Sequence, residues 1–127
     1  MKKWLCRFLG RSERGASLVE FALVVPVLLA LVMGIIEFGW LFNGWITITG
    51  SAREGARLAA VGKDYNEIME AVEKHTSTFE NVYVDPESIF GEEEVSVYVT
   101  GDIRPLVGFF VGGEFVTLNA EATMRSE

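Results

Sequence analysis

The sequence predicts a membrane-anchored α+β protein, in which one long N-terminal transmembrane α-helix precedes a small domain of one helix and a short antiparallel sheet. The first observation is a run of sixteen uncharged residues between Glu20 and Glu37, because about 20 mostly apolar residues suffice for a helix to cross a bilayer. The second is the helical spacing of apolar residues over 65–79, and the third is apolar–polar alternation over 95–99 and 116–124.

The charge distribution predicts how the chain is oriented. Residues 1–15 carry a net charge of +4, whereas the residues from Ser51 onward carry six basic and fifteen acidic side chains, a net charge of −9. Basic residues beside a span stay in the cytoplasm, so we expect a single-pass protein with its C-terminus outside. The acidic outer part argues against nucleic acid as a partner. The expected parts are a basic leader (1–15), the transmembrane helix (16–42), a helical connector (43–62) and an outer domain (63–127).

The transmembrane helix carries a stripe of small residues. Ala22, Pro26, Ala30 and Gly34 recur every four positions, and small residues let membrane helices approach closely. The stripe favours packing against other helices, although small residues are also common in membrane helices without a packing role. Pro26 is expected to kink the helix, because proline lacks an N–H and crowds the preceding turn.

Aromatic residues follow the span at the depth of the outer interface. Trp40 and Trp45 fall about 36–44 Å along a helix that begins at Ala16, where tryptophans form an interfacial belt. Glu37 is expected at the same interface, with no catalytic role.

The connector is predicted to remain helical, with weak points. Gly44 and Gly50 lower helix propensity, so the continuity of the helix through them stays open. The segment 51–60 places alanines on one face, and Gly62 can end it. Arg53 and Arg57 share an edge of this segment, where we expect them to be solvated or paired with acidic groups.

The outer domain is predicted from its periodic patterns. Asp64 and Glu67 have the spacing of a capping box that opens a helix. A short strand over 82–85 precedes the two longer alternating runs, which we expect to pair antiparallel with one face on the helices. The apolar face of the helix comprises Tyr65, Ile68, Met69, Val72, Thr76 and Phe79.

The segment 105–113 between the two long strands is too apolar for a free loop. Phe109 and Phe110 lie at its centre. They either fold back over the sheet or contact the outer leaflet or a neighbouring subunit, and exposed apolar clusters of this kind mark interaction surfaces.

Catalytic and metal-binding patterns are missing from the sequence. His75 is the only histidine and Cys6 the only cysteine, which leaves no catalytic triad, no disulfide and no zinc ligand set. The run 92–94 could bind calcium weakly, but a run of acidic residues is more often a solvated turn. We therefore expect a protein that is not an enzyme and that has no metal and no cofactor.

The start of the span is chemically unusual. An ionised Glu20 inside a membrane would need a partner, and a cut after Gly15 would create a new α-amine at Ala16 that could pair with Glu20 of a neighbour. Gly15, the apolar residues after it and Glu20 resemble the processing site of type IV prepilins. More closely, the segments 14–26 and 52–57 are similar to the TadE family, the pseudopilins of the tight-adherence (Flp) pilus apparatus.

This resemblance implies a function and a set of partners. A prepilin peptidase would cut after Gly15 at the inner membrane, and the product would be a minor pilin that helps to assemble Flp pili. Its partners would be other pilins or pseudopilins and the pilus assembly platform. The alternative is an uncleaved single-pass envelope protein whose outer domain binds a partner or a surface.

Overall fold

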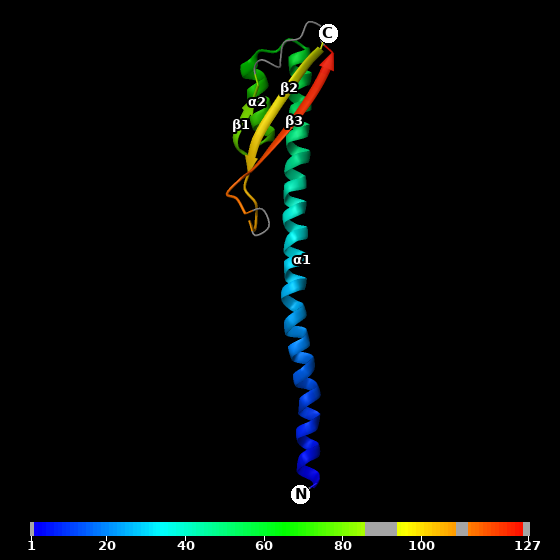
Figure 1. The fold of residues 1–127 in the computed structure, drawn as a ribbon. Helices are drawn as coiled ribbons and strands as arrows, with labels where there is room; N and C mark the ends of the chain where they lie inside the picture. The colour runs from blue at the N-terminus through cyan, green and yellow to red at the C-terminus, as the bar shows by residue number, and fades with distance from the viewer. Residues whose placement is uncertain (1, 86–93, 109–111, 126–127) are drawn as a thin grey trace. The chain divides into compact units, whose positions relative to one another are not determined.

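The computed structural model describes residues 2–85, 94–108 and 112–125, with side chains from residue 15 onward. These residues form two helices and three strands, which confirms the predicted long N-terminal helix, second helix and antiparallel sheet (Figure 1). The chain divides into two compact units, 1–36 and 37–127, which are described separately below. The elements are α1 (Lys2–Ala60), α2 (Tyr65–His75), β1 (Glu80–Val84), β2 (Glu94–Ile103) and β3 (Val116–Arg125).

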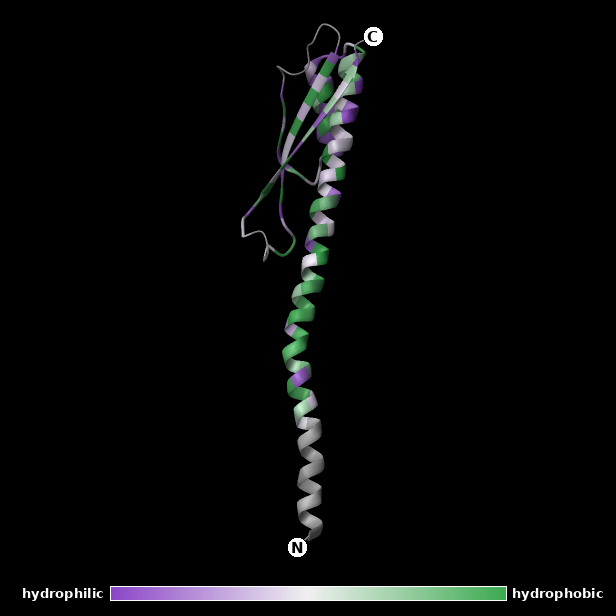
Figure 2. Ribbon diagram, turned by 45° about the vertical axis from the view of Figure 1, so that its right-hand side comes forward, coloured by the Kyte–Doolittle hydropathy of each residue, from purple (hydrophilic) through white to green (hydrophobic). Residues whose placement is uncertain are grey.

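Helix α1 is continuous over 59 residues. It begins at Lys2, so the basic leader is helical, and it runs through Pro26, Gly44 and Gly50 without interruption. From Gly15 to Ala60 it is long and apolar enough to cross a membrane, as judged by length and composition. Figure 2 shows the hydrophobic residues concentrated along the middle of α1.

One of the two doubtful glycines has a packing role. Gly44 is buried, and a Cβ atom there would come within 2.8 Å of Ile103 Cδ1 and 3.3 Å of Leu118 Cδ1. The missing side chain therefore lets the sheet approach the helix, and this burial offsets the helix penalty of about 1 kcal/mol for glycine. Gly50 is exposed, with open space around it.

Helix α2 begins where the sequence predicts, but the predicted capping box is wrong. Asp64 occupies the N-cap position without a side-chain capping bond. Its carboxylate instead accepts a hydrogen bond from Asn66 Nδ2 at 3.2 Å. The helix ends at His75, and the next residue, Thr76, is buried. The hydroxyl of Thr76 donates a hydrogen bond to the backbone carbonyl of Val72 at 2.8 Å.

The strands form one antiparallel sheet in the order β1-β2-β3. Strands β2 and β3 pair without a break from Glu94 opposite Arg125 to Ile103 opposite Val116, as the alternation predicts. The pairing of β1 with β2 is irregular between Glu80 and Tyr83.

The core lies between one face of the sheet and the two helices. Val97 and Val99 of β2 are fully buried, as are Ala52 and Ala56 of α1. The alanines leave room for the strand side chains, which explains why this part of α1 is rich in small residues. Partly buried residues of β3 complete the cluster: Val116, Leu118, Ala120, Ala122 and Met124.

Candidate functional site

The surface of α1 over residues 15–36 is apolar and uncovered. Large hydrophobic side chains point outward from Leu18 to Ile36, and Phe21 and Leu23 are among the most exposed. Soluble monomers rarely expose apolar patches of this size. An uncovered apolar helix of this length suggests membrane anchoring.

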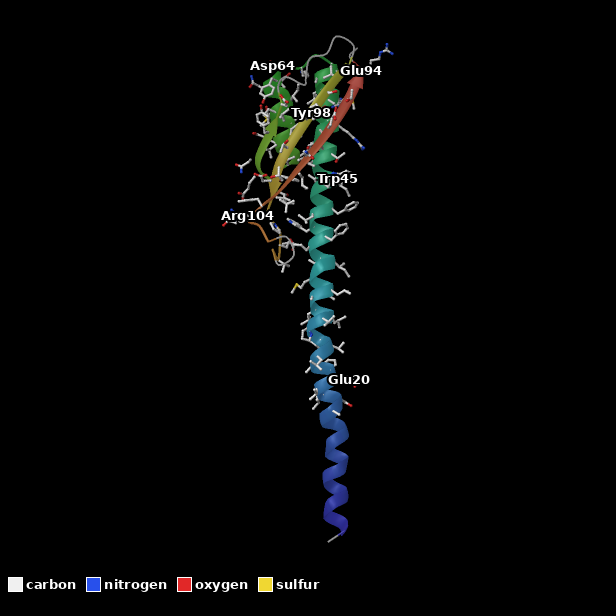
Figure 3. The ribbon with its side chains drawn as sticks, viewed as in Figure 1. Glu20, Trp45, Asp64, Glu94, Tyr98 and Arg104 are labelled. Atoms are coloured by element: carbon white, nitrogen blue, oxygen red, sulfur yellow. The ribbon has the colours of Figure 1, made fainter. Side chains whose placement is uncertain are left out.

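The sequence-predicted site residues lie on this helix. Gly15, Ala16 and Glu20 are all exposed within α1, and Figure 3 labels Glu20 on this helix. A Cβ atom at Gly15 would meet nothing within 4 Å. The described residues of the chain therefore do not bury the Glu20 carboxylate.

The small-residue stripe is equally accessible. Ala22, Pro26 and Ala30 are exposed, and Gly34 is half-buried. The structure leaves these positions free for contacts with another helix, while their packing role stays a prediction.

A second region of interest begins at Glu37, the first residue of the second compact unit. Glu37 is only 2% exposed, and its Oε2 accepts a hydrogen bond from the backbone N–H of Val107 at 2.7 Å. We expected Glu37 at the membrane interface, and the structure adds that the segment 104–108 covers its side chain. Its Oε1 is also buried and has no hydrogen-bond partner among the residues that the structure describes. An unsatisfied buried polar atom costs about 1–3 kcal/mol.

A second hydrogen bond holds the same segment to α1. Trp40 Nε1 donates to the carbonyl oxygen of Arg104 at 2.9 Å. The Arg104 guanidinium forms an ion pair with Glu80 at 2.9 Å and lies 5.0 Å from the ring centroid of Phe115. Sequence reasoning missed these contacts. The one available signal was the position of Glu37 directly after an uncharged run, and nothing local identified its partner.

An aromatic row occupies another face of α1 at this level. Phe38 stacks on Phe42 and Phe42 on Trp45, each pair with ring centroids 6.3 Å apart. Phe38 is 72% exposed, and Ile46 extends the exposed surface. Figure 3 shows Trp45 on the side of α1 away from Arg104.

Of the other charged residues singled out in the sequence, those that the structure describes are exposed or pair within α1. Arg57 pairs with Glu54 of its own helix at 2.6 Å, which holds the pKa of the Glu54 carboxyl below its usual value, while Arg53 is exposed. His75 is exposed, and the described residues contain no group of three or more acidic, histidine or cysteine side chains that could hold a metal ion. Glu92, Glu93, Phe109 and Phe110 lie outside the described residues.

Comparison with known proteins links this geometry to a family. Residues 15–57 match the model of the TadE-like protein family. Comparisons with curated proteins and with solved structures gave no match. The matched range covers the exposed apolar part of α1, Glu20, Glu37 and the aromatic row, and it ends before α2 and the sheet.

Proposed function

We propose that this chain, whose residues 15–57 are TadE-like, is a minor pseudopilin that takes part in the assembly of Flp (tight-adherence) pili. The observation that carries the proposal is the family match over an apolar helix whose side chains are exposed from Leu18 onward. The family connects the chain with pilus machinery. The minor-subunit role follows from the small outer domain, which a filament helix alone would not need.

A prepilin peptidase processes the chain after Gly15. The residues on both sides of this bond are exposed, and glycine leaves space for an enzyme to approach. The cut removes the net positive leader and leaves the whole apolar helix on the product. The product lies in the inner membrane with its domain outside, where it contacts other pilins and the assembly platform. The role requires no cofactor, and the protein itself is not an enzyme.

Glu20 gives the helix a way to recognise a neighbour. A carboxylate in or near the hydrocarbon is costly without a partner, and Glu20 is exposed from its own chain. The α-amine of Ala16 on another processed subunit provides the opposite charge. The stripe from Ala22 to Gly34 then lets the two helices approach closely.

Mass analysis of the N-terminus tests the proposal. The full chain is expressed with and without a prepilin peptidase, and we expect the product that begins at Ala16 only when the peptidase is present. Gly15→Ala should slow the cut strongly, whereas Gly39→Ala, at another helical glycine with open space around it, should not. A functional membrane form that keeps Met1 would instead support the uncleaved envelope protein.

A further inference from the structure

We propose that the outer domain is docked on the lipid bilayer through a collar of exposed apolar side chains at its base, which inserts into the interface of the outer leaflet. The collar lies at the level where α1 leaves the span. Its members come from two segments that are distant in sequence. They are Phe38, Phe42, Trp45 and Ile46 of α1, and Leu106 and Val107 of the segment after β2.

The length of the exposed apolar surface sets the depth of the collar. From Leu18 to Ile46 this surface follows α1 for about 42 Å, at 1.5 Å per residue. The hydrocarbon core is about 30 Å thick, and the bilayer is about 40–45 Å thick with its headgroup regions. The last of these residues therefore reach the headgroup region, where tryptophan is favoured.

Hydrogen bonding places the second segment at the same depth or deeper. Val107 is bonded to Glu37, which precedes Trp45 by eight residues, or about 12 Å along the helix toward the span. If Trp45 lies in the headgroup interface, the segment 104–108 cannot lie farther from the bilayer centre than Trp45 does. Leu106 is 57% exposed and Val107 is also exposed, so both side chains would meet lipid.

The distribution of the collar favours lipid over a second copy of the chain. Trp45 lies on the side of α1 away from Arg104 (Figure 3). Arg104 belongs to the segment that carries Leu106 and Val107 and is bonded to Trp40 and Glu37, so the two parts of the collar do not share one face of α1. A bilayer surrounds a helix on all sides, whereas a second copy would cover only one of them. The collar also adjoins the apolar surface that already needs lipid.

The contact is apolar and not electrostatic. The chain from Ser51 onward has a net charge of −9, which an anionic bilayer would repel. Arg104 is already paired with Glu80. Zwitterionic lipid should therefore be sufficient for docking.

A fluorescent label reports the depth of Leu106 directly. The full chain carries Cys6→Ser, which removes its only cysteine, together with Leu106→Cys labelled with an environment-sensitive dye, in phosphatidylcholine vesicles. The matched control is Val61→Cys, because Val61 is equally apolar and 64% exposed but follows the end of α1. We expect lipids with a headgroup-level nitroxide to quench the label at 106 and not the label at 61, and aqueous iodide to do the reverse.

Two results would overturn the proposal. Iodide could quench the label at 106 as strongly as the label at 61, which would place the segment in water. Alternatively, the shielding at 106 could disappear when the protein is diluted in lipid, which would assign the collar to a second copy. The experiment needs the span but not the cut after Gly15, so its failure is distinguishable from failure of the pseudopilin proposal.

Discussion

The carboxylate of Glu37 accepts a hydrogen bond from the backbone N–H of Val107 at 2.7 Å, although 70 positions separate the two residues. Together with the bond from Trp40 to Arg104, it fixes the segment after β2 against α1. The junction between the helix and the domain is therefore ordered by polar contacts.

The Glu37 contact can be tested by hydrogen exchange at the Val107 amide. Glu37→Ala removes the acceptor, and loss of about 1–2 kcal/mol locally should speed exchange by a factor of about 5–30. Glu37→Gln keeps an oxygen that can accept the bond and is the control, so its exchange should change much less. Equally slow exchange in the alanine variant would contradict the assigned role. Local exchange is the better measurement, because the substitution also removes the unpartnered Oε1.

Glu20 should matter for assembly and not for insertion or cleavage. Because its side chain is exposed from its own chain, Glu20→Ala should be processed normally and stay in the membrane. It should nevertheless fail to co-purify with pilins, since the partner for the new α-amine is lost. Ser17→Ala, at another exposed position of the same segment, is the control. Wild-type piliation by the Glu20 variant would remove the charge-pairing role.

Two glycines should respond in opposite directions to alanine. At Gly101 a Cβ atom would lie 2.9 Å from Phe79 Cδ1 and 3.3 Å from its Cβ, and the ring is buried. Gly101→Ala should therefore destabilise the domain by about 1–3 kcal/mol. At Gly50, which lies within α1, a Cβ atom would have no neighbour within 4 Å. Gly50→Ala should therefore stabilise the protein by about 0.5–1 kcal/mol. Denaturant unfolding of the full chain in detergent measures both, and the same sign for the two variants would contradict this packing.

Asp102 should make part of the stability of the domain pH-dependent. Hydrogen bonds from Thr117 Oγ1 at 2.7 Å and Asn81 Nδ2 at 3.1 Å lower the pKa of its carboxyl below 3.8. A lowered pKa in the folded state stabilises the protein above the unfolded-state value, and this contribution is lost as the pH falls through the folded-state value.

Unfolding of wild-type protein and Asp102→Asn between pH 6 and pH 2 tests this linkage. The wild-type protein should lose stability relative to the variant only below about pH 4. Thr117→Val removes the hydrogen bond that lowers the pKa of Asp102 most. This variant should therefore lose less stability below about pH 4 than the wild-type protein does. A constant difference across the whole range would exclude a contribution from the Asp102 carboxyl.

The periodic elements of this protein could be predicted from the sequence because their causes are local. The uncharged run after Glu20 indicates the apolar helix, and the alternation over 95–99 and 116–124 indicates two paired strands. A stretch of about ten residues contains all the information that such a pattern needs. The processing residues Gly15 and Glu20 were likewise named from the sequence, and their role remains a prediction.

What the sequence by itself determined is therefore the order and type of the elements, together with the face that each presents to the core. Tertiary structure alone decided that Ile103 and Leu118 pack against α1 at Gly44, where a side chain would collide with them. It also decided that Asp64 does not form a capping box and that Glu37 binds Val107. Such contacts join residues that are far apart in the chain, and their free energy depends on a geometry that exists only after the sheet has packed on the helix.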